Sequence, residues 1–198
     1  MRNSQAGPIR QVAGCRRLLA CSLVGALILG QAGALAQAHA PAQADAAPAP
    51  EENVKAAFIF NFAVFTEWPL ASLAPGAPLT LCTYPGNSLQ AALAGLNDKL
   101  VNGHPLQVRL LGATARLRAC HIVVLGNGDR ERWGQARKEL ADASILTVAD
   151  ETSIGDDGAV ITLGVENRRI GFDVALAAAR QARVVLSSKL LRLARSVQ

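Results

Sequence analysis

The stretch LGNGDRERW, Leu125 to Trp133, contains the residue types that come closest to a known chemistry. Two glycines follow one apolar run, and Asp150 stands at the end of the next apolar run. This arrangement resembles a dinucleotide-binding fingerprint. The third glycine of that motif would fall at position 131, which is Glu131. Asp129 and Glu131 would also place negative charge where a pyrophosphate must bind. The stretch therefore predicts a helix start stabilised by acidic side chains, and not a nucleotide site.

Other reactive side chains are few, and their spacing does not suit catalysis or metal binding. Beyond residue 40 the histidines are His104, in a predicted turn, and His121, which follows Cys120. Adjacent residues of a strand point to opposite faces, so this adjacency does not imply a nucleophile pair. The patterns CxxC, HExxH and GxSxG do not occur. We therefore expect no enzyme activity, no cofactor and no metal.

Three polar residues each follow a predicted strand, namely Tyr84, Asn127 and Asp150. In an α/β sheet the carboxyl ends of the strands border the crevice in which ligands bind. These residues leave a small-molecule-binding module as the alternative function. Each of them is also an ordinary turn residue.

An aromatic segment, KAAFIFNFAVFTEWP from Lys55 to Pro69, holds five of the eight aromatic residues. A helix over residues 54–68 would be about 22 Å long, too short to cross a hydrocarbon core of about 30 Å. A helix that is apolar on all sides is normally buried. One stripe predicts core residues, and these are Phe58, Phe62 and Phe65. A second stripe contains Val64 and our candidate partner-binding residues, Phe60 and Trp68, because partly exposed apolar patches tend to be interaction sites.

The first fifty residues predict export and a tether. Residues 1–40 have a basic start, a 13-residue apolar run (Leu18–Gly30) and small-residue cleavage sites between Ala36 and Ala40, which is the layout of a signal peptide. Residues 41–50 are rich in Ala and Pro and predict a linker. Residues 51–198 then form one folded domain, with no membrane span after cleavage.

Removing this leader changes the charge and cysteine counts. Four of the 20 Lys and Arg residues, and none of the 15 acids, lie in residues 1–40, so 16 cations and 15 acids remain. A net charge of +1 does not argue for nucleic acid as a partner. Of the four cysteines, Cys82 and Cys120 remain. An even pair in an exported domain indicates a disulfide, and two buried free thiols are the alternative.

The domain alternates strand-like and helix-like segments. We expect strands at 78–85, 106–111, 121–126 and 145–148, a hairpin over 159–174 that turns near 166–168, and a short extended piece at 183–186. Helices are expected at 54–68, 88–95, 129–140, 173–182 and 189–197. This order predicts a single α/β domain with a mixed, mostly parallel sheet flanked by helices and a late antiparallel hairpin.

Several of these segments together resemble the YfiR family. They are VKAAFIFNFAVFTEWP, LTLCTYPG, VNGHPLQVR, ACHIVVLG, ILTVAD and GFDVALAAARQARVVLSSKLLRLAR, and they run from Asn53 to Val197. The opening KAAFxxNFxxFxxWP and the ending LSSxLLxLA are together quite specific.

The resemblance implies a non-enzymatic periplasmic regulator with an α/β fold. Such a protein binds the sensor domain of an inner-membrane diguanylate cyclase, holds it inactive and so lowers cyclic di-GMP. The resemblance also implies a disulfide between Cys82 and Cys120, and it allows a homodimer. A second bridge found in some members has no counterpart here, because no cysteine follows Cys120.

Overall fold

Two continuous apolar runs form the middle of the sheet. In a computed structural model, which describes residues 49–112 and 115–198, these runs are β5 (Ile122–Leu125) and β6 (Leu146–Ala149). Every residue of both strands is buried. Strands of this kind are covered by protein on both faces, as the sequence predicts.

The helices are short apart from the first and third. They are α1 (Glu51–Val64), α2 (Gln90–Ala94), α3 (Arg130–Leu140), α4 (Thr152–Asp156), α5 (Leu176–Gln181) and α6 (Ser188–Leu191), with 3₁₀ turns η1 (Leu117–Ala119) and η2 (Asn127–Asp129). The described residues belong to one compact unit, 46–198. The predicted leader (1–40) and most of the predicted linker (41–50) lie outside the described residues.

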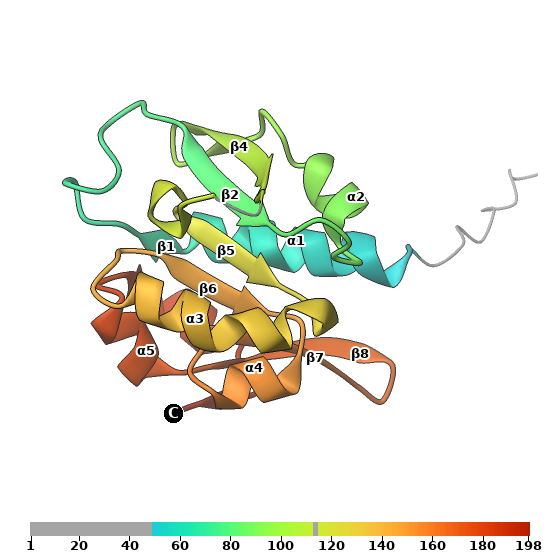
Figure 1. Ribbon diagram of the computed structural model, residues 1–198. Coiled ribbons are helices and arrows are strands. Elements are labelled where there is room, and N and C mark those ends of the chain that lie inside the picture. Colours follow the sequence, from blue (N-terminus) through green and yellow to red (C-terminus); the bar gives the residue numbers. More distant parts are fainter. Residues whose placement is uncertain (1–48, 113–114) are drawn as a thin grey trace, which may run out of the picture. The chain divides into compact units, whose positions relative to one another are not determined.

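The main sheet has the strand order β10-β8-β7-β6-β5-β2-β4-β3 (Figure 1). Its remaining strands are β2 (Leu79–Thr83), β3 (Leu100–Val101), β4 (His104–Leu110), β7 (Ile161–Glu166), β8 (Arg169–Val174) and β10 (Ser196–Val197). The pairs β7–β8 and β3–β4 are antiparallel, and the other neighbours are parallel. The predicted fold class, with its late antiparallel hairpin, is confirmed.

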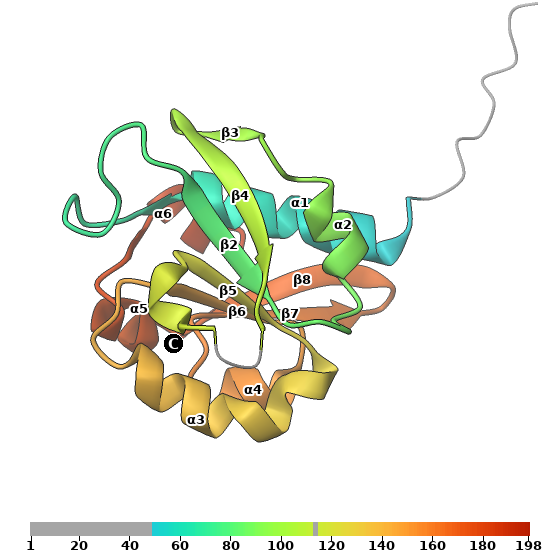
Figure 2. The ribbon, with the colours of Figure 1, turned by 45° about the horizontal axis from the view of Figure 1, so that its top comes forward.

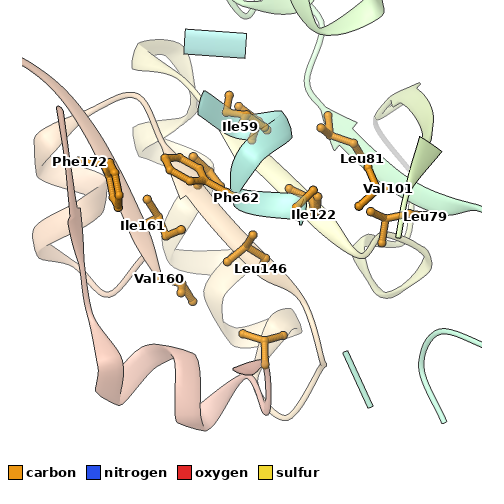
Figure 3. Close-up of a cluster of buried hydrophobic side chains, with 14 of the residues drawn as sticks. Ile59, Phe62, Leu79, Leu81, Val101, Ile122, Leu146, Val160, Ile161 and Phe172 are labelled. Atoms are coloured by element: carbon orange, nitrogen blue, oxygen red, sulfur yellow. The ribbon is translucent and has the colours of Figure 1, made fainter. Parts of the chain in front are cut away.

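Helices cover both faces of this sheet (Figure 2). On one face, buried residues of α1, α2, α5 and α6 join a single apolar cluster with every second strand residue. Phe62 is at its centre, with its ring centroid 4.8 Å from that of Phe172 (Figure 3). On the other face, η1, α3 and α4 enclose a second cluster around Trp133. The indole N–H of Trp133 donates to the carbonyl of Asp157 at 3.1 Å, which ties α3 to the end of α4.

The first helix ends earlier than the sequence suggests. It stops at Val64, and the Thr66 hydroxyl donates back to the Phe62 carbonyl at 2.6 Å. The chain then becomes extended as β1 (Thr66–Glu67), which pairs with β9 (Val185–Leu186) in a separate two-stranded ribbon. Trp68 therefore lies beyond the helix, and its expected place on one helical stripe with Phe60 is wrong.

The last predicted helix is also shorter than expected. Ser187 caps α6, but the helix stops at Leu191 and β10 pairs with β8. Arg195 directs this change, because its guanidinium bonds to Asp173 and its backbone N–H donates to the Phe172 carbonyl at 2.8 Å. Its side chain lies over the facing pair Gly164 and Gly171, where a Cβ would come within 2.7 Å of it. A Cβ at Gly171 would meet the inner part of the arginine side chain, whereas a Cβ at Gly164 would meet only its flexible guanidinium end, so glycine matters more at Gly171.

Candidate functional site

The aromatic residues of α1 divide into buried and half-buried groups. Phe62 is fully buried, while Phe58 and Phe65 are half-buried against the same apolar cluster. The Phe58 ring lies 6.1 Å from both Phe62 and Phe172. The expected core stripe thus packs against the core along its whole length.

Phe60 lies on another side of α1, next to the edge of the sheet. Its ring is half-buried against the apolar cluster, and the ammonium of Lys99 lies 5.8 Å from the ring centroid. One turn further along, the Asn102 amide donates to the carbonyl of Val64 at 2.9 Å. Lys99 precedes β3 and Asn102 follows it, so β3 lies alongside this part of α1.

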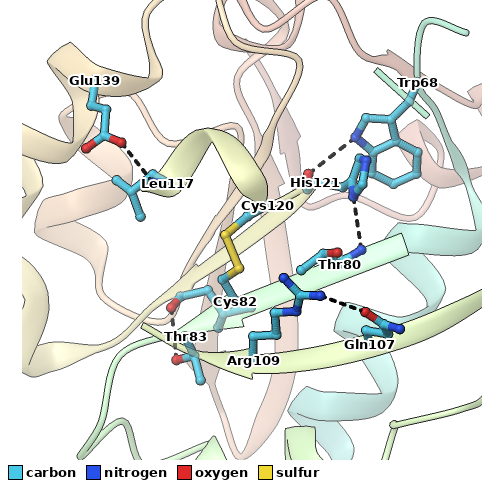
Figure 4. Close-up of a disulfide and its surroundings, with 11 residues drawn as sticks. Trp68, Thr80, Cys82, Thr83, Gln107, Arg109, Leu117, Cys120, His121 and Glu139 are labelled. Carbon is cyan, nitrogen blue, oxygen red and sulfur yellow. Dashed lines mark hydrogen bonds between the residues drawn. A yellow bond between two sulfur atoms is a disulfide. The ribbon is translucent and has the colours of Figure 1, made fainter. Parts of the chain in front are cut away.

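Trp68 reaches the same edge of the sheet from beyond the helix. Its ring is half-buried, and its indole N–H donates to the carbonyl of His121 at 3.3 Å (Figure 4). Beside it is a cavity of about 370 Å³, lined by Thr66, Glu67, Trp68, Leu70, Leu73, Leu79, Val101, Asn102 and His104. Leu70, at the cavity's rim, is 78% exposed.

These residues form what we name the α1–β3 surface: Phe60, Val64, Trp68, Leu70, Lys99 and Asn102. Both candidate partner-binding residues belong to it, and both are half-buried rather than fully exposed. The sequence did not indicate that β3 would join them, because a two-residue strand has no periodic signal. Their role in binding stays a prediction.

His121 organises the backbone behind Trp68. Its Nδ1 accepts a hydrogen bond from the Thr80 backbone N–H at 3.0 Å, and its Nε2 lies 3.0 Å from the carbonyl of Ser72. The ring is therefore neutral and carries its proton on Nε2. Burial lowers its pKa, in opposition to the hydrogen bond with Ser72. His121 is occupied by these backbone contacts and is not paired with a nucleophile.

Cys82 and Cys120 are joined in a disulfide, as the resemblance implies (Figure 4). The bridge links β2 to the residue before His121, with the two Cα atoms 5.9 Å apart. Both cysteines are buried, at 2% and 4% exposure. They pack with Leu117 and Val123 in the cluster on the α3 face.

The three residues of the alternative ligand site do not come together. Tyr84 packs under Arg132, whose guanidinium carbon is 4.5 Å from the ring centroid. Asn127 is exposed in η2. Asp150 turns toward the opposite face, where it pairs with Lys55 of α1 at 2.8 Å. Tyr84 and Asp150 are thus used in separate contacts on opposite faces, and Asn127 lies exposed apart from both.

The Lys55–Asp150 pair is largely shielded from solvent. The two side chains are only 12% and 10% exposed, whereas Glu51, a second partner of Lys55 at 2.7 Å, is 51% exposed. Burial raises the pKa of Asp150, although the Lys55 ammonium opposes that shift. The pair fixes the N-terminal part of α1 to the end of β6, and no pattern in the sequence indicated it.

The glycine-containing stretch also behaves as a structural turn. Asp129 is buried, and its carboxylate accepts the backbone N–H of Gly126 at 2.8 Å. It therefore occupies the position that an anionic ligand would need. Within residues 49–112 and 115–198, no group of three or more His, Cys, Asp or Glu residues is placed to hold a metal ion. In the same ranges, no helix has the length and hydropathy needed to cross a membrane.

The fold and these contacts define a mixed α/β domain whose distinctive surface is apolar and whose reactive side chains serve internal contacts. Residues 52–195 match the sequence profile of the YfiR/HmsC-like family. The chain belongs to this family. The family is known for periplasmic regulators of diguanylate cyclase signalling and is regulatory rather than catalytic.

A solved structure shares the fold. It is the crystal structure of a conserved domain protein from Vibrio cholerae O1 biovar El Tor strain N16961, with a TM-score of 0.50 and 11% sequence identity. The similarity covers 75% of this chain and 60% of that chain. At this identity it supports the fold alone. No curated protein matches the chain.

Proposed function

We propose that this protein is a non-enzymatic periplasmic regulator, which binds and inhibits the sensor domain of an inner-membrane diguanylate cyclase and so lowers cyclic di-GMP. Membership of the YfiR/HmsC-like family supports the class of partner. The observation that carries the proposal on this chain is the α1–β3 surface, where Phe60 and Trp68 are only half-buried and Trp68 lines a cavity of about 370 Å³.

The chemistry of this surface suits a protein partner. Phe60 and Trp68 offer large apolar area at little cost in side-chain entropy, and Lys99 adds a cation beside Phe60. Leu70 extends the apolar area into solvent. A partner loop with an apolar side chain for the cavity and a carboxylate for Lys99 would complement it.

Inhibition then follows from selective binding. The regulator binds one conformation of the sensor domain and shifts the membrane protein toward its inactive state. A shift of the enzyme from about 99% active to about 99% inactive requires roughly 10⁴-fold tighter binding to the inactive form than to the active form. Release by a ligand, by a redox change or by sequestration would restore activity.

The deciding experiment measures cellular cyclic di-GMP with and without the gene, with complementation by the exported protein. We expect deletion to raise cyclic di-GMP and complementation to restore it. An unchanged level would contradict inhibition of a cyclase. A thermal shift with a small molecule in the absence of any protein partner would instead favour the ligand-binding alternative.

Surface variants locate the interaction. Lys99→Glu changes an exposed side chain and should weaken binding without loss of melting temperature. Phe60→Ala and Trp68→Ala should weaken binding further, with some loss of stability because both rings are half-buried. Val165→Ala, which removes a 47% exposed side chain from the β7–β8 hairpin, is the matched control. If Phe60→Ala and Trp68→Ala lower stability but keep binding, they are ordinary packing residues.

A further inference from the structure

The outer edge of β4 is only partly covered. On its inner side, β2 pairs with β4 from Leu106 to Leu110. On its outer side, β3 pairs with only the first two residues of β4, His104 and Pro105. The second half of β4 therefore forms an edge of the sheet.

The hydrogen bonds show which backbone groups face outward. Leu111 donates to the carbonyl of Thr83, so the odd-numbered residues of β4 face β2. Leu106 exchanges hydrogen bonds with Lys99 and Asp98 on the outer side, so the even-numbered residues face outward. Val108 and Leu110 consequently direct their backbone N–H and C=O groups away from the sheet.

One of these outward groups is already satisfied by a side chain. The Asn97 amide oxygen accepts the Val108 N–H at 3.1 Å, in the place where a neighbouring strand would supply a carbonyl. Among the described residues, the Val108 carbonyl and the Leu110 N–H and carbonyl have no such partner. An edge of this kind is a template for an added strand.

The side chains along this edge indicate which strand it would accept. Leu110 is 51% exposed and offers apolar contact. Arg109 is exposed, and its guanidinium is held at 3.0 Å by the neutral amide of Gln107. Among residues 49–112 and 115–198, no carboxylate pairs with Arg109. The edge therefore carries an uncompensated positive charge.

We propose that the outer edge of β4, from Gln107 to Leu110, binds an extended acidic segment of a partner protein by strand addition. The added segment would accept the Leu110 N–H, donate to the Val108 and Leu110 carbonyls, and place a carboxylate near Arg109. A second copy of this chain is a poorer partner, because antiparallel pairing centred on this edge would bring two Arg109 side chains together. The inference goes beyond the proposed function, since it needs neither the α1–β3 surface nor a cyclase.

The test follows single backbone amides by hydrogen exchange and NMR. The probe is a synthetic seven-residue peptide of alternating Glu and Val, and its matched control has Lys in place of Glu. We expect the acidic peptide to slow exchange of the Leu110 amide by about tenfold or more, while the Arg109 amide, already bonded to β2, is unchanged. The Lys peptide should bind more weakly by roughly 1.5- to fivefold per charge pair.

Two variants make the result specific. Arg109→Glu keeps the strand and should reverse the preference, so that the Lys peptide protects Leu110 better than the acidic one. Leu110→Pro removes the outward N–H, and with it the reporter amide, but leaves the odd-numbered bonds to β2; it should abolish the shift changes that the acidic peptide induces in the neighbouring backbone amides. The proposal is overturned if millimolar acidic peptide leaves Leu110 exchange unchanged, or if Arg109→Glu does not alter the preference.

Discussion

At the scale of single residues, the polar side chains of this domain mostly hold the backbone in place. His121 bonds to the chain at Thr80 and Ser72, and Asp129 caps the turn at Gly126. Residues that suggested chemistry in the sequence are thereby used in folding. The His121 contacts and the Lys55–Asp150 pair have measurable consequences for stability.

Lys55→Met should destabilise the domain by roughly 2–3 kcal/mol at neutral pH, because it leaves the shielded carboxylate of Asp150 without a counterion. Chemical denaturation measures this change. Since burial already raises the pKa of Asp150, the deficit should shrink in acid, where that carboxyl becomes neutral. Glu51→Gln removes the exposed partner of Lys55 and should cost under about 0.5 kcal/mol. Equal losses from both variants would contradict this account.

Acidification should weaken the domain through His121. Its pKa is lowered by burial, so the unfolded chain takes up a proton at a higher pH than the folded chain. The stability it contributes is complete above the unfolded pKa of about 6.5 and is lost as pH falls below that value toward the folded pKa. Melting temperatures between pH 8 and pH 5 measure the effect. His121→Asn keeps an acceptor for Thr80 but does not titrate, and a slope that persists in this variant would assign the effect elsewhere.

At the scale of the elements, the longer segments with a regular apolar pattern were predictable from the sequence. The pairings between very short strands were not. The apolar runs of β5 and β6, the amphipathic α3 and the late hairpin carry their own signals in the sequence. The pairing of β1 with β9 joins segments of two residues each, which have no measurable period. It ends α1 early and moves Trp68 off the helix. In the same way, Arg195 shortens the last helix through its contacts with β8, and local propensity does not register those contacts.

The candidate site follows the same division. Phe60 and Trp68 could be proposed because a segment that is apolar all round suggests an unburied remainder. Lys99 and Asn102 complete the surface because β3, which lies between them in the sequence, packs beside α1. Only the tertiary structure shows this packing. The Lys55–Asp150 pair spans 95 residues of sequence and was equally invisible.

The β7–β8 turn offers a test at this scale. Its two loop residues, Asn167 and Arg168, have φ values of 51° and 59°, which define a tight turn of the type that favours Asn-Gly. Asparagine tolerates this conformation better than arginine does. Arg168→Gly should therefore stabilise the domain by about 0.5–1 kcal/mol, measured by denaturation. Arg169→Gly, one residue into the strand, should instead destabilise, and a loss from both would argue against turn strain.

At the scale of the whole molecule, the disulfide is the main covalent constraint. It closes a loop with a sequence separation of 38 between β2 and the segment just before β5, and these two strands are already paired. In the chain-entropy description this is worth about 3–4 kcal/mol. Removal of the bridge should therefore loosen the half of the sheet that leads to β4.

Cys82→Ser combined with Cys120→Ser should lower the melting temperature by about 10 °C. Reduction of the native protein should produce a similar shift, and the double variant should no longer respond to reductant. Calorimetry with and without reductant measures both. An unchanged melting temperature would remove redox control from the possible means of release.

The β1–β9 ribbon also sets an order of events during synthesis. Thr66 can pair with Leu186 only after a further 120 residues (186 minus 66) have been synthesised. At ribosomal speeds of 5–20 residues per second this delay is roughly 6–24 s. Throughout it, the segment richest in aromatic side chains has left the ribosome without its final neighbours. The helix proposed to recognise a partner in the mature protein is thus among the last parts of the nascent chain to gain its final contacts.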